Sequence, residues 1–188
     1  MARIRTIYGP MFSGKTREIL KLHAEFSSKK LVFKHALDSR TRETLSSHDP
    51  EVSDKVPAIP INSLYQILEY IEHDTKIVFV DEAQFFDLTQ TVTFLSKMGS
   101  KDILFIFSGL DLNWKGEPFE TMSYLIQKAD DRNWMLGKCA QCGDAASHSY
   151  FKHHASNDSI KVIGGSEAYE PRCQSCFTLG METCATTA

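Results

Sequence analysis

The residues best suited to chemistry lie near the start of the chain, where positions 9–16 read Gly-Pro-Met-Phe-Ser-Gly-Lys-Thr. Glycines at this spacing, followed by lysine and threonine, are typical of a loop that binds nucleotide phosphates. The backbone N–H groups can surround the α- and β-phosphates, and the glycines let the backbone approach where a Cβ would clash. Lys15 would supply charge to the β- and γ-phosphates, and the Thr16 hydroxyl would ligate Mg²⁺. The residues expected to line the phosphates are Gly9, Met11, Phe12, Ser13, Gly14, Lys15 and Thr16.

The second chemical feature is an acid pair, Asp81 and Glu82, that follows the apolar run 77–80. Such a run favours a strand buried on both faces, and α/β sheets bind ligands at the carboxyl ends of their strands. Asp81 is therefore expected to contact the Mg²⁺ that Thr16 touches, directly or through water. Glu82 could take a proton from an attacking hydroxyl, as in a kinase, or orient a water, as in an ATPase. A merely structural or solvated acid is the third alternative, and these two motifs do not decide among them.

A third feature is a set of four cysteines arranged as two Cys-x-x-Cys pairs. Cys139 and Cys142 form the first pair, Cys173 and Cys176 form the second, and residues 143–172 separate them. Each turn presents two thiolates from one tight loop, and Zn²⁺ takes four soft ligands in a tetrahedron. Two such turns close the coordination sphere, so the expected role is a structural Zn²⁺ site. Reduced core cysteines and a redox pair are the alternatives, although redox chemistry needs one Cys-x-x-Cys alone.

The spacing of apolar residues predicts the elements that must position these groups. The expected strands span 3–8, 30–34, 76–80 and 102–107, and the expected helices span 16–26 and 62–72. Strands that alternate with helices predict an α/β fold of the P-loop NTPase (RecA-like) type, with a mainly parallel sheet flanked by helices. The stretch 38–60 is rich in Ser, Thr, Pro and charge, and it is expected to be a long mobile connection.

The composition excludes several classes of protein. A net charge of −3 argues against broad, sequence-independent binding of nucleic acid. The apolar runs are too short to span a bilayer, and the N-terminus has no signal-peptide pattern, so a cytoplasmic protein with reduced cysteines and no membrane partner is expected. Residues 81–84 also resemble the acid box of nucleic-acid helicases, but those enzymes need two such domains, which 188 residues cannot supply.

Taken together, these motifs resemble the type II (cellular-type) thymidine kinases from Ile4 to Phe177. The matching segments, in order, are the phosphate loop, the acid box at 81–86, Gly109-Leu110-Asp111 with 116–119, the lasso loop at 162–169 and the four cysteines. The resemblance implies phosphorylation of the 5′-hydroxyl of thymidine and deoxyuridine by ATP with Mg²⁺, a homotetramer, and feedback inhibition by thymidine triphosphate. It also implies a P-loop nucleotide-binding α/β domain over 1–136, a small zinc-ribbon and lasso domain over 137–180, and a tail over 181–188.

The resemblance further assigns roles to single residues. Glu82 would be the general base that accepts the 5′-hydroxyl proton, while Lys15 and Thr16 handle the phosphates and Mg²⁺ with Asp81 close to the metal. Asp38 and Arg40 match an Asp-x-Arg motif, and the Arg40 guanidinium would stabilise the transferred phosphoryl group. A flat base is held by stacking and oriented by polar backbone groups. The residues expected around the thymine are Met11, Phe85, Leu110, Trp114, Ser149, Val162, Ile163, Gly164, Gly165 and Tyr169.

Each of these assignments has a simpler alternative. Phe85 could be a core aromatic residue that follows a strand, Tyr169 an ordinary tyrosine, and Arg40 a solvated charge. The chain also departs from the family pattern, because Trp114 stands where the family usually has Phe and Ser149 stands where some members have Thr. Both departures could change the selectivity for the base, and neither changes a residue that is expected to transfer the phosphoryl group.

A different class of function is a P-loop ATPase whose zinc ribbon docks nucleic acid or a protein partner. A ribbon that binds DNA should carry lysine and arginine around its cysteines. Lys138 and Arg172 do flank the cysteines here, but nearby acids offset their charge. Those acids are Asp144, Glu167 and Glu170. The lasso and the aromatic pocket, which such a ribbon would not need, favour the kinase.

Overall fold

The computed structural model describes residues 2–38, 43–46, 55–152 and 164–185 of the chain. Its larger part is a six-stranded sheet in the order β5-β2-β6-β7-β1-β8, and all neighbouring strands in it are parallel. The strands are β1 (Arg3–Tyr8), β2 (Lys30–His35), β5 (Ile59–Ile61), β6 (Ile77–Asp81), β7 (Leu104–Gly109) and β8 (Asp131–Trp134). Every residue of β6 is buried, as its apolar run predicts. The parallel sheet confirms the predicted α/β fold.

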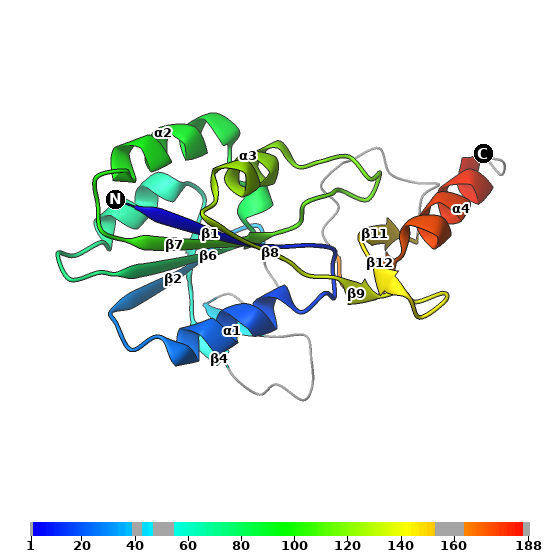
Figure 1. The fold of residues 1–188 in the computed structure, drawn as a ribbon, viewed down its shortest axis with the longest axis horizontal. Coiled ribbons are helices and arrows are strands. Elements are labelled where there is room, and N and C mark those ends of the chain that lie inside the picture. The colour runs from blue at the N-terminus through cyan, green and yellow to red at the C-terminus, as the bar shows by residue number, and fades with distance from the viewer. Residues whose placement is uncertain (1, 39–42, 47–54, 153–163, 186–188) are drawn as a thin grey trace.

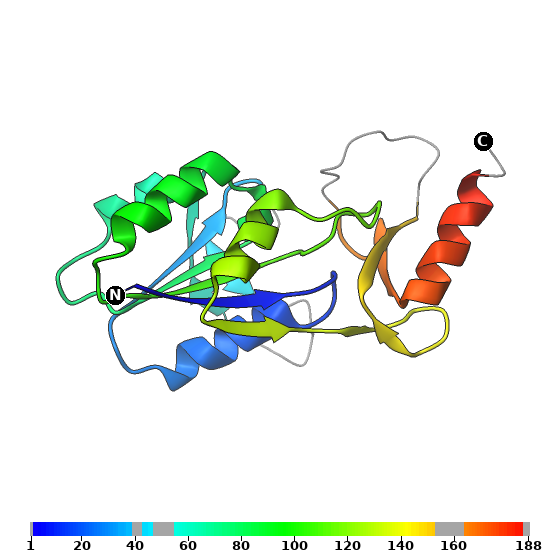
Figure 2. The same ribbon diagram turned by 45° about the horizontal axis from the view of Figure 1, so that its top comes forward.

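Helices cover both faces of this sheet (Figure 1). The α-helix α1 (Lys15–Glu25) packs on one face through Ile19, Leu20 and Leu22. The other face is covered by α2 (Leu88–Met98), α3 (Glu120–Lys128) and the 3₁₀ helix η1 (Leu64–Glu69). Figure 2 shows the same two layers of helices from another side. The sheet therefore separates two apolar cores.

The region between β2 and β6 differs from the sequence-based expectations in two respects. The helix expected over 62–72 is the shorter 3₁₀ helix η1, which begins after a capping box formed by Ser63 and Gln66. Its buried residues Leu64 and Ile67 lie three apart, which matches the three residues per turn of a 3₁₀ helix. Tyr70 then bonds back to Ile67 with the same three-residue spacing and ends the element.

In the stretch 38–60, expected to be a long mobile connection, the described residues include short strands. β3 (Thr44–Ser46) and β4 (Lys55–Pro57) form an antiparallel pair. Leu45 and Val56 from these strands pack in the core beneath α1, and this burial explains why the strands form. Residues 39–42 and 47–54 of the stretch lie outside the described residues.

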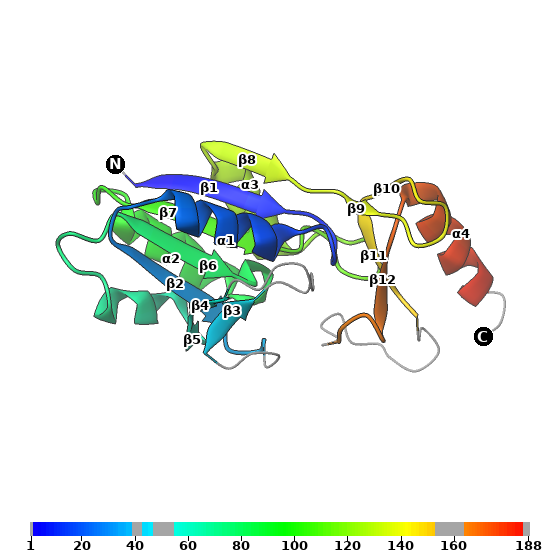
Figure 3. The ribbon, with the colours of Figure 1, turned by 90° about the horizontal axis from the view of Figure 1, so that it is seen from below.

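The smaller part of the molecule follows the edge strand β8 and lies at one end of the sheet (Figure 3). Its elements are β9 (Gly137–Lys138), β10 (Ala145–Ala146), β11 (His148–Phe151), β12 (Tyr169–Arg172) and α4 (Gln174–Ala185). β9 pairs with β10 and β11 pairs with β12, both antiparallel. α4 runs past residue 180 to Ala185. Across the described ranges, each helix lacks the length and apolar character needed to cross a bilayer.

Candidate active site and metal centre

The phosphate loop turns sharply between β1 and α1. Gly9 has φ 144°, Phe12 φ 62° and Gly14 φ 88°. At Gly9 this conformation is combined with close packing, because a Cβ there would overlap the carbonyl oxygen of Met135. α1 begins at Lys15, so its first N–H groups and the positive end of its dipole face the loop. The loop therefore has the geometry of an anion site at a helix N-terminus.

The Lys15 ammonium group stays within this loop. Its Nζ donates hydrogen bonds to the carbonyl oxygens of Gly9, at 3.0 Å, and Pro10, at 2.6 Å. Burial raises the pKa values of the Asp81 and Asp111 carboxyls, and the charge of Lys15 offsets a small part of the rise at each. The loop lysine thus lies within electrostatic range of carboxylates that follow two other strands, β6 and β7.

Asp81 and Glu82 lie where β6 ends. Asp81 is buried, and this burial, together with the negative charge of Glu82, raises the pKa of the Asp81 carboxyl to about 7. Glu82 adopts a left-handed conformation with φ 56°, which turns the chain out of the strand and into the 3₁₀ helix η2 (Ala83–Phe85). The negative charges of two adjacent carboxylates oppose each other, so a divalent cation with oxygen ligands would be stabilised between them.

Two residues near these carboxyls received no role in the sequence analysis. Gln84 is buried and hydrogen-bonds both Glu82 and the backbone of Leu110. Asp111 follows β7, and its Oδ1 has no hydrogen-bond partner among the described residues. Burial raises the pKa of the Asp111 carboxyl. Both residues stand inside motifs quoted for the family resemblance, but the motifs alone do not say what their side chains contact.

An aromatic cluster joins the phosphate loop to the smaller part of the molecule. Trp114, Phe151 and Tyr169 are buried together, and the Phe151 ring centroid lies 5.7 Å from that of Trp114 and 5.2 Å from that of Tyr169. Met11 and Phe12 of the loop pack against them. Burial raises the pKa of the Tyr169 hydroxyl to about 12, so this group stays protonated. Met11, Trp114 and Tyr169, three of the residues expected around the base, are thus brought together.

Other residues expected around the base lie beside this cluster or take different partners. The Met11 N–H donates to the Ser149 hydroxyl at 2.9 Å, so β11 holds the loop directly. The Phe85 ring lies 5.7 Å from the His35 ring, and Leu110 packs against the core that α2 and α3 cover. The Tyr169 N–H donates to the carbonyl of Gly165 at 2.9 Å.

The remaining expected residues fall into two groups. Gly164 lies close to Tyr169, because a Cβ on Gly164 would be 3.6 Å from the Tyr169 ring. Asp38 forms a buried ion pair with Lys34, with 3.4 Å between Nζ and Oδ2. Arg40, Val162 and Ile163 lie outside the described residues.

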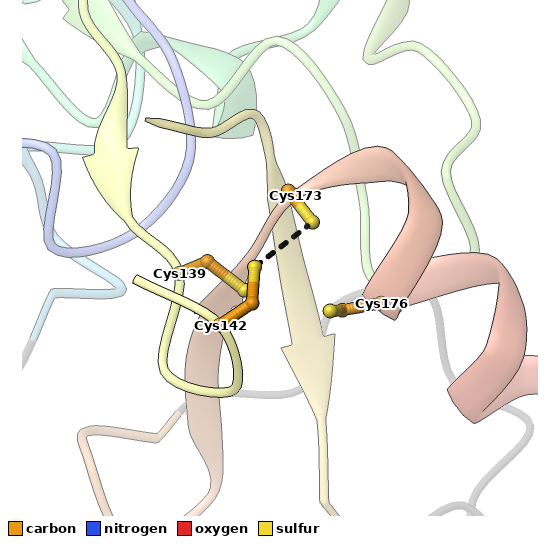
Figure 4. Close-up of side chains that lie close together, drawn as sticks. All are labelled: Cys139, Cys142, Cys173 and Cys176. Carbon is orange, nitrogen blue, oxygen red and sulfur yellow. Dashed lines mark hydrogen bonds between the residues drawn. The ribbon is translucent and has the colours of Figure 1, made fainter. Parts of the chain in front are cut away.

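The four cysteines converge on one point (Figure 4). Cys139 and Cys142 come from the turn after β9, and Cys173 and Cys176 come from the start of α4. All four Sγ atoms lie within 4.8 Å of one another, and those of Cys142 and Cys173 are 3.6 Å apart. Tetrahedral zinc with Zn–S bonds of about 2.3 Å needs sulfurs about 3.8 Å apart, whereas a disulfide needs about 2.05 Å. The spacing therefore fits a closed zinc site.

The thiols of this cluster do not ionise equally. Burial disfavours the Cys139 thiolate, but backbone N–H groups, first that of Cys142, outweigh this effect and lower the pKa of Cys139 to about 6. The Asp144 N–H favours the Cys142 thiolate, but hydrogen bonding with the Cys139 sulfur outweighs it and raises the pKa of Cys142 to about 12. Ionisation of the Cys139 thiol thus disfavours ionisation of the Cys142 thiol. Four thiolates need a cation among them, which agrees with the chemistry of a structural metal site.

The comparisons with known proteins agree with this site. A protein family described as Thymidine kinase matches residues 2–177, which include the phosphate loop, the acid pair and all four cysteines. The thymidine kinase of Bacteroides thetaiotaomicron is 36% identical over 179 residues, covering 93% of this chain and 86% of that protein. The thymidine kinase of Bacteroides fragilis is 34% identical over 184 residues, covering 96% of this chain and 89% of that protein. The chain therefore belongs to the thymidine kinase family.

Proposed function

We propose that the chain transfers the γ-phosphoryl group of ATP, supplied with Mg²⁺, to the 5′-hydroxyl of thymidine and of deoxyuridine. Membership in the family and the names of the two relatives support thymidine as the acceptor. One structural observation carries the proposal. The phosphate loop and the acid pair meet at the same edge of the sheet, where the Lys15 charge acts on Asp81.

On the donor side, the loop N–H groups and the start of α1 would hold the phosphates. Lys15 would exchange its carbonyl partners for β- and γ-phosphate oxygens, which are stronger acceptors because they are charged. Thr16 and Asp81 would hold Mg²⁺, which would offset the negative charge of the phosphates. The family resemblance also places Asp38, whose carboxylate pairs with Lys34, in the set that would bind the phosphates and Mg²⁺. Arg40 keeps its proposed role on the γ-phosphoryl group through the family resemblance alone.

On the acceptor side, Glu82 would act as the general base. The 5′-oxygen forms a bond to the γ-phosphorus, the bond between that phosphorus and the β,γ-bridging oxygen breaks, and the hydroxyl proton passes to the Glu82 carboxylate. ADP and thymidine monophosphate are the products. The thymine would lie between Phe85, Leu110 and Tyr169, with Met11 and Trp114 around it. Ser149 and residues 162–165 would surround its polar edge.

The zinc centre and the assembly complete the proposal. Zn²⁺ on the four cysteines would hold the turn after β9 against the start of α4, and so fix β11 and β12 beside the phosphate loop. The lasso and the aromatic cluster would exclude water from the acceptor side, which would favour transfer to a nucleoside over hydrolysis. A homotetramer and feedback inhibition by thymidine triphosphate, with its own phosphates in the loop, are further parts of the proposal that rest on the family resemblance.

The test is to incubate the protein with ATP and Mg²⁺ and to measure the monophosphates formed from thymidine, deoxyuridine and deoxycytidine. Glu82→Gln is compared with Glu69→Gln, a matched substitution at the exposed end of η1. We expect thymidine phosphorylation to fall by about 10²- to 10⁴-fold in Glu82→Gln and to be unchanged in Glu69→Gln. ATP hydrolysis without any nucleoside monophosphate would overturn the proposal and favour the ATPase class.

A further inference from the structure

We propose that Gln84 is a positioning residue, which fixes the Glu82 carboxylate and the backbone of Leu110 in one geometry through its two amide atoms. The inference rests on the proposed function, because it takes Glu82 as the general base. It goes further by giving a role to a residue outside the sets proposed to bind the phosphates and the nucleoside.

The two hydrogen bonds of Gln84 join the ends of two neighbouring strands. Its Nε2 donates to Glu82 Oε2 at 2.6 Å, just beyond β6. Its Oε1 accepts the N–H of Leu110 at 3.1 Å, just beyond β7. These distances are within the normal range for such bonds, and the first is short because its acceptor is a carboxylate. One side chain therefore links the proposed base to the strand end that carries a predicted nucleoside contact.

The chemistry of the partners fixes which way the amide faces. A backbone N–H can only donate, so the oxygen of Gln84 must face Leu110. An ionised carboxylate can only accept, so the NH₂ group must face Glu82. Each end of the amide has one compatible partner. This orientation is the one required when Glu82 is ionised and can accept a proton. A flipped amide would break both bonds at once.

The surroundings of Gln84 leave its side chain little freedom. The residue is 3% exposed and lies in the short 3₁₀ helix η2. A Cβ on Gly109 would lie 2.5 Å from Gln84 Oε1, so the amide occupies space that only a glycine leaves open. Beyond η2, the Thr121 hydroxyl donates to the Phe86 carbonyl at 2.7 Å and anchors the following turn to α3. η2 is thus held at both ends, with the amide between them.

Positioning of this kind is expected to act on the rate more than on substrate binding. Glu82 adopts a left-handed conformation at the end of β6, so its side chain projects from a turn. A general base works only within hydrogen-bond reach of the proton that it takes, and a displacement of about 1 Å can cost about 10²-fold in rate. The bond from Gln84 would keep the carboxylate at that position.

Two substitutions separate the two bonds. Gln84→Met keeps the length of the side chain and removes both bonds. Gln84→Glu keeps an acceptor for Leu110 but replaces the donor to Glu82 with a second carboxylate. At pH 8 we expect Gln84→Glu to lower kcat by at least about tenfold and to change KM for thymidine by less than about threefold. Gln84→Met should lower kcat similarly and also raise KM for thymidine.

A double-mutant cycle with Glu82 shows whether Gln84 acts through it. If it does, Gln84→Met should change the residual kcat of Glu82→Gln by less than about threefold, because the carboxylate that it positions is already absent. Gln66→Met is the matched control, since it also removes an amide oxygen that accepts backbone N–H groups, here those of Asn62 and Ser63 in the cap of η1. Its kcat should stay at the parent value, and thermal unfolding of every variant checks its fold.

The outcomes distinguish the inference from the proposed function. Parent-like kcat in Gln84→Met, or losses that multiply in the double variant, would overturn the positioning role while leaving Glu82 as the base. Parent-like kcat in Glu82→Gln would overturn the base assignment and, with it, the inference. Loss of kcat in both Gln84 variants, with no further loss in the double variant, would support both.

Discussion

Replacing Gly9 with alanine is expected to disable the use of ATP while the protein stays folded. Gly9 has φ 144°, a region that L-residues rarely adopt, and the added Cβ would overlap the Met135 carbonyl oxygen and lie 3.0 Å from its carbon. The backbone conformation alone costs about 1–3 kcal/mol for alanine. To restore ordinary contact distances, the loop and Met135 must separate by about 1 Å.

That separation reaches the phosphate site directly. The Gly9 carbonyl accepts a hydrogen bond from Lys15, so the lysine and the loop N–H groups move with it. A misplacement of about 1 Å in a positioning element costs about 10²-fold. We therefore expect kcat/KM for ATP to fall by at least about 10²-fold. The assay is the initial rate of thymidine monophosphate formation at saturating thymidine with ATP varied.

The matched control is Gly99→Ala at the end of α2. Gly99 has φ −54°, which alanine adopts readily. The atom nearest to an added Cβ would be the Ser96 carbonyl oxygen, at 3.4 Å. This variant should be as active as the parent and equally stable, or slightly more stable because the unfolded chain is less flexible. A folded Gly9→Ala protein with the parent kcat/KM for ATP would refute the reasoning from loop geometry.

Three further predictions concern stability and the metal. Thr121→Val leaves the buried Phe86 carbonyl without its 2.7 Å donor, so urea melts should show a loss of about 1–3 kcal/mol. Cys173→Ser should lose bound zinc, measured by elemental analysis, and unfold at lower temperature, whereas Cys184→Ser, outside the four-cysteine set, should keep the zinc. Because the pKa of Asp81 is raised from 3.8 to about 7, the folded metal-free protein holds a proton that the unfolded chain releases above pH 4. Its stability should therefore fall from pH 4 to 7 in urea melts, and Asp81→Asn should reduce this fall, whereas an unchanged slope would contradict the assigned burial.

The chemical groups of this protein could be predicted from the sequence because local spacing encodes them. The phosphate loop, the acid pair after an apolar run and the two Cys-x-x-Cys turns each place their residues within a few positions of one another. The central strands could be predicted for the same reason, since residues 77–80 of β6 are all apolar and every residue of the strand is buried. The parallel order then brings the loop and the acid pair to one edge.

The contacts between these segments could not be predicted in the same way. The bond from Leu110 to Gln84 spans 26 positions, and the bond from Met11 to Ser149 spans 138. Each of these bonds depends on which segments become neighbours in the fold, and composition and periodicity do not determine that order. The strands β3 and β4 were missed because three-residue strands with polar neighbours show little alternation. The apolar spacing of η1 does not distinguish it from an α-helix, because buried residues three apart fit both kinds of helix.

The contact between the phosphate loop and the smaller part of the molecule has a consequence for building hybrid proteins. Met11 of the loop donates to Ser149 of β11, and Gly9 packs under the carbonyl of Met135, which lies between β8 and β9. Met135 itself donates to the carbonyl of Tyr8, the residue before the loop. A hybrid that joins the sheet of this chain to the zinc-binding part of a relative would therefore place its seam against the nucleotide site. Such an exchange has to carry the loop, Met135 and Ser149 from one parent.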